Sequence, residues 1–320
     1  RFAKGMYSRF FVIDGHCDTI SKLDDINAME CQNIAHISLP GLREGGVGIQ
    51  FFAVWMDPSY AGKYFHMGLQ LIDRYKRMLN KYATHFHPVL RLSDAQDALE
   101  AGRIGTLLTV EGGDVLEGNL SNLEMLYNAG VRLLTLTWNR SNQIAGAAMD
   151  DNIRYGLTQF GAEVVKAMND LGMMVDVSHA SDKAFWDVME VSRKPVIASH
   201  SNARAICAHP RNLSDEQVKA IALKGGVIGI NFYPSFLNKT GEAGIIDIIK
   251  HIEYIAGLTG IDCIAFGSDF DGIEILPRGI EGPQNFPDII EELLRLNYSE
   301  EEVRKICHNN FLRVIGKILK

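Results

Sequence analysis

The chain has 320 residues, of which 47% are hydrophobic, and a net charge of −7. This charge gives no support for a polyanionic partner such as nucleic acid, and the hydrophobic content suffices for a large buried core. We expect one domain over residues 1–320, because α/β barrels commonly reach this length as one unit. Residues 1–5, before Met6, are expected to be a remnant of cloning, a mature start or a disordered end.

Eight short apolar runs, rich in β-branched residues, follow one another along the chain. They occupy residues 10–14, 47–54, 106–110, 132–137, 173–177, 195–198, 227–231 and 263–267. These runs are almost continuously hydrophobic, which is typical of parallel strands that are covered on both faces. Eight units in which a strand alternates with a helix predict the α/β class and a closed (β/α)8 TIM barrel.

Between several of these strands, apolar residues recur at helical spacing. This pattern predicts helices over residues 69–82, 158–171, 181–191 and 214–223. Ser214 and Gln217 form the sequence pattern of a capping box, which predicts a helix start. Ser299, followed by three glutamates, predicts the start of the last helix. Gly130, Gly172 and Gly260 are expected at helix ends.

Ionisable residues follow five of the eight strands directly. His16 and Asp18 follow the first strand two positions apart, so that in an extended segment both side chains point the same way. The residues after the third, fifth, sixth and eighth strands are Glu111, His179, His200 and Asp269. Taken singly, each has an ordinary structural explanation, such as a helix cap or a satisfied polar pair.

The set as a whole predicts a metal site. The C-terminal ends of barrel strands meet at one mouth, where the active sites of this fold lie. Carboxylates brought together there would repel one another unless a cation neutralised them. Imidazole and carboxylate ligands without thiolate favour zinc, with manganese or another divalent ion as the alternative. Cys17 lies between His16 and Asp18 and should point away from the metal.

The chain resembles the membrane (renal) dipeptidase family in motifs that occur in the family's order. They lie at 14–18 (Asp-Gly-His-Cys-Asp), 111–113 (Glu-Gly-Gly), 134–137 (Leu-Thr-Leu-Thr), 177–179 (Val-Ser-His), 199–201 (Ser-His-Ser), 210–212 (Pro-Arg-Asn) and 267–272 (Gly-Ser-Asp-Phe-Asp-Gly). Residues 286–314 also resemble the last helices of the family. The similarity covers nearly the whole chain, and the motifs are specific as a set although none is specific alone.

The resemblance implies a barrel of the metal-dependent hydrolase type that cleaves small dipeptides with two zinc ions per chain. His16 and Asp18 would bind one ion, His179 and His200 would bind the other, and Glu111 would bridge them. A hydroxide shared by the two ions would attack the peptide carbonyl.

Two further residues have implied roles in this reaction. Asp269, the second expected catalytic residue beside Glu111, would take the proton of the water and pass it to the leaving amine. Arg211 would hold the carboxylate of the substrate and so restrict substrates to dipeptides. The resemblance also implies tolerance of a D-residue at the C-terminal position.

One position departs from the pattern of the mammalian members, which carry a histidine that contacts the tetrahedral intermediate. Here the residue is Trp138, and an indole has no acceptor nitrogen. Bacterial relatives share a tryptophan there, so that Trp138 is either a wall of the pocket or a sign of lost activity. Asn139 or Arg140 is the candidate for the missing donor. Tyr233, like Phe236, is expected as a further wall of the substrate pocket.

Location, assembly and alternative functions complete the predictions. The five cysteines are odd in number, widely spaced and without a C-x-x-C motif, which fits a reducing compartment. No run reaches the ~20 apolar residues of a membrane span, so we expect a cytoplasmic, microbial-type member without a membrane partner. Family members are often homodimers, and a homodimer is expected here. The alternatives are another metal-dependent barrel hydrolase (a deaminase, lactonase or phosphoesterase) and a catalytically silent metal-binding barrel.

Overall fold

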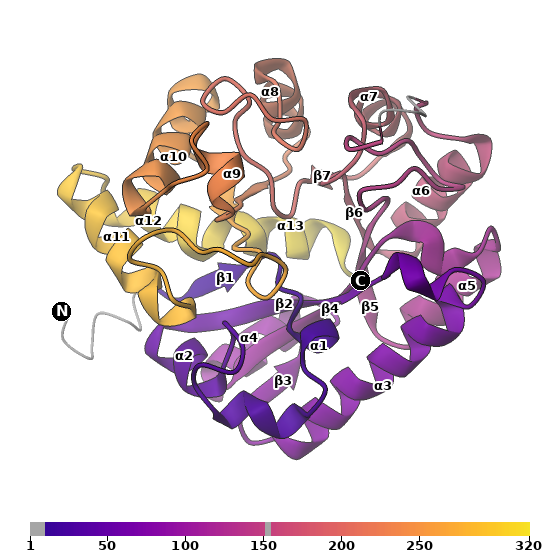
Figure 1. The fold of residues 1–320 in the computed structure, drawn as a ribbon, viewed down its shortest axis with the longest axis horizontal. Coiled ribbons are helices and arrows are strands. Elements are labelled where there is room, and N and C mark those ends of the chain that lie inside the picture. Colours follow the sequence, from indigo (N-terminus) through magenta and orange to yellow (C-terminus); the bar gives the residue numbers. More distant parts are fainter. Residues whose placement is uncertain (1–9, 151–154) are drawn as a thin grey trace.

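The computed structural model of the chain describes residues 10–150 and 155–320. Residues 1–5, for which the sequence suggests three origins, lie outside the described residues. Eight parallel strands form a barrel and helices surround it, as Figure 1 shows. The barrel strands are β1 (Val12–Asp14), β2 (Val47–Trp55), β4 (Ile104–Glu111), β5 (Val131–Thr135), β6 (Met174–Asp176), β7 (Val196–Ile197), β8 (Ile228–Ile230) and β9 (Ile264–Phe266).

The order of these strands confirms the predicted (β/α)8 barrel. Neighbouring strands run β7-β6-β5-β4-β2-β1-β9-β8. A parallel bridge between Ala198, just after β7, and Ile228 of β8 joins the two outermost strands. The first and last strands pair as well, with Asp14 opposite Phe266. The ring is therefore nearly closed, and the eight strands predicted from the sequence are its members.

One strand lies outside the ring. Strand β3 (Phe86–Pro88) pairs in parallel with β4, with Phe86 opposite Ile104. The sequence pattern gives no indication of β3, because three residues that end in proline are too short and too irregular for a period of two to be recognised.

The described ranges contain thirteen α-helices, of which the last three follow the last strand. They are α1 (Thr19–Lys22), α2 (Leu39–Glu44), α3 (Tyr64–Lys81), α4 (Leu92–Glu100), α5 (Leu120–Asn128), α6 (Gln159–Leu171), α7 (Asp182–Val191), α8 (Asp215–Leu223), α9 (Pro234–Leu237), α10 (Ile245–Thr259), α11 (Phe286–Arg295), α12 (Glu300–Arg304) and α13 (Asn310–Ile318). The four helices predicted from apolar spacing are confirmed as α3, α6, α7 and α8, although α3 begins at Tyr64 and not at 69. None of the described helices combines the length and the apolar composition needed to cross a membrane.

The predicted caps are also present. The hydroxyl of Ser214 accepts a hydrogen bond from the backbone N–H of Gln217 (3.3 Å), and the Gln217 side chain accepts one from the N–H of Ser214 (2.8 Å). Ser299 caps α12 in the same way, and a π-helical turn over Lys305–Asn309 continues that helix into α13. The chain therefore ends in one bent helical segment.

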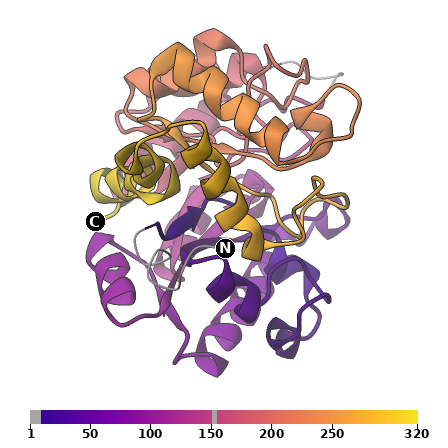
Figure 2. The same cartoon turned by 90° about the vertical axis from the view of Figure 1, so that its left-hand side faces the viewer.

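Helix α13 fills the end of the barrel opposite the predicted site. Its apolar face packs with the inward-facing strand residues Ile13, Phe51 and Leu107. The tip of the Phe311 ring would be only 2.6 Å from a Cβ atom added to Gly15, which leaves no room for a side chain there. In Figure 2 the yellow C-terminal helices lie between the purple N-terminal part of the chain and the orange part.

Candidate active site

Six ionisable side chains converge at the C-terminal ends of the barrel strands. Glu111 is the last residue of β4, whereas the other five lie just beyond their strands. The six residues are 1–8% exposed and comprise His16, Asp18, Glu111, His179, His200 and Asp269. Burial of this many ionisable groups is costly unless they are paired or bind a cation.

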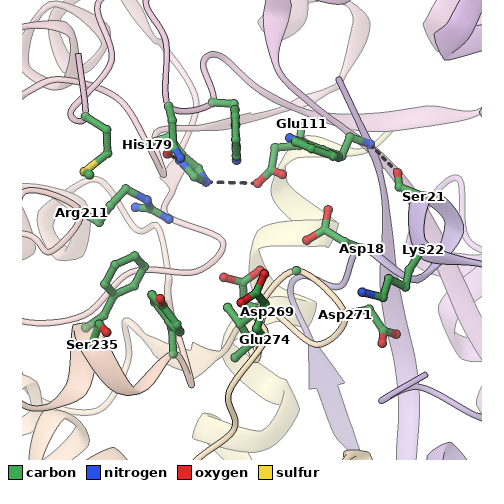
Figure 3. Close-up of a pocket in the computed structure, with 18 of the residues that line it drawn as sticks. Asp18, Ser21, Lys22, Glu111, His179, Arg211, Ser235, Asp269, Asp271 and Glu274 are labelled. Carbon is green, nitrogen blue, oxygen red and sulfur yellow. Dashed lines mark hydrogen bonds and ion pairs between the residues drawn. The ribbon is translucent and has the colours of Figure 1, made fainter. Parts of the chain in front are cut away.

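Three imidazoles face one carboxylate oxygen. The Nε2 atoms of His16, His179 and His200 lie 3.3, 3.2 and 3.3 Å from Oε2 of Glu111. Figure 3 shows the contact between His179 and Glu111 as a dashed line. The Nε2 atoms of His179 and His200 are also only 3.1 Å apart. At most one proton can lie between two such nitrogens, so that hydrogen bonds alone do not satisfy this cluster.

The carboxylates on the other side of the cluster lead to the same conclusion. Oδ2 of Asp18 lies 3.0 Å from Nε2 of His16, and Oδ1 of Asp269 lies 3.7 Å from the same nitrogen. The second oxygen of Asp18 is buried and has no hydrogen-bond partner within 10–150 and 155–320. An unpaired buried carboxylate oxygen beside several nitrogen donors fits the ligand set of a divalent cation.

The potential ligand atoms form two overlapping groups, each within 4.8 Å. One group is His16, Glu111 and His200, and the other is His16, Asp18 and Asp269. The pairing that the family resemblance implies also uses His179, which is in neither group but has its Nε2 3.1 Å from that of His200 and 3.2 Å from Oε2 of Glu111. All five predicted metal ligands are therefore brought together. Cys17 points elsewhere, since its thiol donates a hydrogen bond to the carbonyl oxygen of Phe51 (3.3 Å).

Partners behind the histidines hold their rings in place. Nδ1 of His179 lies 3.0 Å from Oδ1 of Asn139, and Nδ1 of His200 lies 2.8 Å from the hydroxyl of Ser199. That hydroxyl donates to Asp176 (2.5 Å). A partner at Nδ1 fixes the ring and leaves Nε2 facing the cluster, which is the usual arrangement around metal-binding histidines. His179 also has a left-handed backbone (φ 71°), an uncommon conformation for this residue type.

Burial and neighbouring charges shift the pKa values of the cluster in opposite directions. Burial raises the pKa of Glu111 and lowers the pKa values of His179 and His200. Burial also lowers the pKa of His16, but the carboxylates of Glu111 and Asp18 outweigh it and raise this pKa well above its usual value. Burial raises the pKa of Asp269 to about 7. Without a cation, Glu111, Asp269 and His16 therefore hold protons more tightly than the same groups do in water.

Asp269 and Arg211 stand on either side of the open part of the site. Asp269 has a left-handed backbone (φ 66°), and its Oδ2 accepts a hydrogen bond from the Asn231 amide (3.0 Å). The buried guanidinium of Arg211 donates to the carbonyl oxygen of His200 (3.2 Å) and lies 5.3 Å from the centre of the Phe236 ring. Its Nε atom has no partner among the described residues. Arg211 therefore retains donors for an anionic ligand.

A cavity of about 750 Å³ opens above the cluster. Trp138 and Tyr233 line it, as the sequence predicts for pocket walls. The Trp138 ring packs edge-to-face on Trp55, with ring centres 5.0 Å apart. Arg140 is exposed and is not among the described residues that line the cavity, whereas Asn139 is. The geometry thus gives Asn139, and not Arg140, a place beside the cluster.

The comparison with known families decides the assignment. Residues 1–320 match the family model described as membrane dipeptidase (peptidase family M19). The chain belongs to the membrane dipeptidase family. As a member of that family it is a metallo-dipeptidase, which does not favour the deaminase, lactonase or phosphoesterase alternatives.

Solved structures of other dipeptidases share this fold. A dipeptidase described as an M19 metallopeptidase is 26% identical, with a TM-score of 0.91, and the match covers 97% of this chain and 99% of that one. A metallopeptidase from Rhodobacter sphaeroides, solved with a phosphinate mimic of the dipeptide L-Ala-D-Ala, is 26% identical with a TM-score of 0.89 over 97% and 99% of the two chains. An amidohydrolase from Pseudomonas aeruginosa is 27% identical, with a TM-score of 0.86 over 98% of both chains.

Several residues of the dipeptidase site lack a signal in the sequence. Trp55, Met149 and Lys22 line the cavity, although none of them stands in a motif of the family. Asp271 belongs to the motif at 267–272 but has no predicted role. These residues come from the end of a strand (Trp55), the last turn of the short helix α1 (Lys22) and irregular segments (Met149 and Asp271), whose positions depend on tertiary packing.

Proposed function

We propose that this dipeptidase hydrolyses dipeptides with two zinc ions, one held by His16 and Asp18 and one by His179 and His200. Glu111 would contact both ions. The observation that supports this proposal is the convergence of three imidazole nitrogens, each within 3.3 Å, on one oxygen of Glu111. Zinc is favoured because the ligands are imidazoles and carboxylates with no thiolate among them.

When bound, two divalent ions would lower the pKa of a water molecule and polarise the peptide carbonyl. Asp269 would accept the proton of the attacking water and donate it to the leaving amine. Asp269 is buried beside the cluster, within reach of a water held there, and a carboxylate in this position can serve first as base and then as acid. The Asn231 amide, 3.0 Å away, orients the carboxylate of Asp269 for this transfer.

Arg211 would bind the C-terminal carboxylate of the substrate. Its guanidinium is buried beside the cluster, and a fork of N–H donors suits a carboxylate. A substrate carboxylate bound at Arg211, next to the cluster that holds the reacting carbonyl, would leave room for only one residue after the scissile bond. The R. sphaeroides relative was solved with a mimic of L-Ala-D-Ala, and we propose that the present chain also accepts a D-residue at this position.

The test is hydrolysis of L-Ala-D-Ala and L-Ala-L-Ala by protein purified without chelator, together with elemental analysis. We expect about two zinc ions per chain, and loss of activity with a chelator that added zinc restores. In the Asp269→Asn variant we expect retained zinc and a kcat lower by about 10²–10⁴-fold. Metal-free protein, or an Asp269→Asn variant as active as the wild type, would contradict the proposal. Turnover of esters or nucleobases without dipeptide cleavage would point to a different hydrolase.

A further inference from the structure

We propose that Lys22 selects dipeptides whose N-terminal residue has an acidic side chain, aspartate or glutamate. This inference rests on the proposed function, because it assumes a dipeptide with its carboxylate at Arg211 and its peptide carbonyl at the histidine–carboxylate cluster. The inference specifies the chemical class of the N-terminal residue of the dipeptide, which precedes the scissile bond.

Lys22 and Arg211, the lysine and the arginine among the described residues that line the cavity, lie on opposite sides of the cluster. In Figure 3 Arg211 lies on the same side as His179, whereas Lys22 lies across Glu111 and Asp18 from it, and both point into the space between. A dipeptide with its C-terminal carboxylate at Arg211 would extend its N-terminal residue away from Arg211. The N-terminal side chain would therefore point toward Lys22.

Local structure places Lys22 next to the cluster. Asp18 is the N-cap of α1, and the backbone N–H of Lys22 donates to the carbonyl oxygen of Asp18 (3.0 Å). Residues four apart lie on the same face of a helix, one turn from each other. Arg74 of α3 fixes the end of α1 by donating to the carbonyl oxygens of Ile20 (2.9 Å) and Leu23 (2.7 Å). The Lys22 side chain therefore begins from a fixed backbone position.

Lys22 forms no ion pair with the residues that the structure describes. Within 10–150 and 155–320, its ammonium group has no carboxylate oxygen within 4.0 Å. Asp271, which lines the same cavity, already accepts hydrogen bonds from the Thr19 hydroxyl (2.6 Å) and from the N–H groups of His36 (2.6 Å) and Ile37 (3.2 Å). Glu274, at the rim, is exposed. A substrate carboxylate would thus supply the partner that Lys22 lacks.

The cavity wall near Lys22 also suits the methylene groups of an acidic substrate side chain. Trp55 lines the cavity and is held next to α1, since its backbone N–H donates to the hydroxyl of Ser21 (3.1 Å). An aromatic ring can cover the methylene groups of a glutamate side chain, while the carboxylate at its end reaches the ammonium. A basic N-terminal side chain would meet a like charge at the same place.

The test compares kcat/KM for L-Glu-L-Ala and L-Gln-L-Ala with zinc-loaded enzyme at low ionic strength, because the two substrates differ only in charge. We expect the glutamate substrate to be preferred by about two- to fivefold in the wild type, as for an ion pair with an exposed lysine. The preference should disappear in Lys22→Met and invert in favour of L-Lys-L-Ala in Lys22→Glu. Lys166→Met, on the exposed face of α6, makes the same change in net charge and should keep the wild-type preference.

The readout is the ratio of kcat/KM for the two substrates within each variant. A general loss of activity lowers both values and leaves this ratio unchanged. Equal kcat/KM for both substrates in the wild type, or an unchanged preference in Lys22→Met, would overturn the proposal for Lys22. Failure of the proposed function looks different, because zinc-loaded protein would then cleave neither dipeptide. Added salt should weaken the preference, since it screens an exposed charge pair.

Discussion

Asp271 and Thr19 connect the segments that follow the first and the last barrel strands, β1 and β9, beside the active site. The Thr19 hydroxyl donates a hydrogen bond of 2.6 Å to Oδ2 of Asp271, and thereby ties the segment of Asp269 to the helix that Asp18 caps. The backbone N–H of Asp271 donates in turn to Nδ1 of His36 (2.9 Å). Asp271 also has a left-handed backbone (φ 65°), as Asp269 does. We infer that Asp271 is a positioning residue for Asp269.

The Asp271→Asn variant should lose both stability and turnover. An amide has one acceptor oxygen, so that it cannot accept from Thr19, His36 and Ile37 together, and a buried donor left unpaired costs about 1–3 kcal/mol. We expect lower stability in urea unfolding and a kcat reduced by about tenfold with zinc content retained. Thr19→Val should give a smaller effect in the same direction, and Thr19→Ser should resemble the wild type. Wild-type kcat in Asp271→Asn would refute the positioning role.

Asn139 should control zinc affinity through His179. Asn139→Leu removes the acceptor 3.0 Å from Nδ1 of His179 and leaves the ring free to turn. Loss of such a partner typically lowers metal affinity by about 10–100-fold, which competition with a chromophoric chelator measures. Asn139→Asp keeps an acceptor and should retain most of the affinity. Equal affinity in the leucine variant and the wild type would show that the ring is held by other contacts.

Gly272 should be essential for the shape of the site. A Cβ atom at this position would lie 2.1 Å from Oδ2 of Asp18 and 2.4 Å from Oδ1 of Asp269. We therefore expect Gly272→Ala to displace these carboxylates and to lose most zinc and activity. The matched control is Gly257→Ala in α10, where nothing lies within 4 Å of the added atom. That change should raise stability by about 0.4–1 kcal/mol and leave kcat unchanged. An active, zinc-replete Gly272→Ala variant would rule out this packing.

Zinc should stabilise the protein more as the pH rises. Burial raises the pKa of Asp269 from 3.8 to about 7, so the folded, metal-free protein binds more protons here than the unfolded chain. The metal-free protein therefore loses stability as the pH rises through this window, and a bound cation removes the cost by replacing the protons. The lowered pKa values of His179 and His200 act in the opposite direction on the metal-free protein, because the unfolded chain binds more protons at these histidines than the folded protein does. They do not change the gain from zinc, since the folded, metal-free protein holds few protons there for zinc to displace. We expect the gain in Tm with zinc to be larger at about pH 7.5 than at about pH 5.5. An equal gain at both pH values would contradict this coupling.

The barrel could be predicted because its longest strands are buried along nearly their whole length. β2 and β4 have almost no exposed position, so that their sequences are largely hydrophobic, and Glu111 stands out at the end of β4. The shorter strands β1 and β7, which precede His16 and His200, are buried as well, so that these histidines also follow apolar runs. β3 has no such pattern, and its position depends on pairing with β4.

The rest of the site could not be located from the sequence, for physical reasons. The sequence offers Asn139 only as an alternative to Arg140 and does not predict its contact with His179, because both lie in an irregular stretch whose path is set by tertiary contacts. Met149 lies in the same stretch, and Lys22 has no distinguishing sequence pattern, since its place in the site depends on α1. Arg140, only one residue beyond Asn139, is exposed instead of lining the cavity. The single-domain organisation, the cytoplasmic location and the homodimer remain predictions.

The contact between Phe311 and Gly15 has a consequence for biosynthesis. The ring that supports the turn before His16 belongs to α13, and β1 pairs with β9. His16 can therefore reach its final position only after β9 and α13 have been translated. We expect nascent chains that stop before α13 to capture zinc poorly, and cofactor loading to follow the synthesis of this helix.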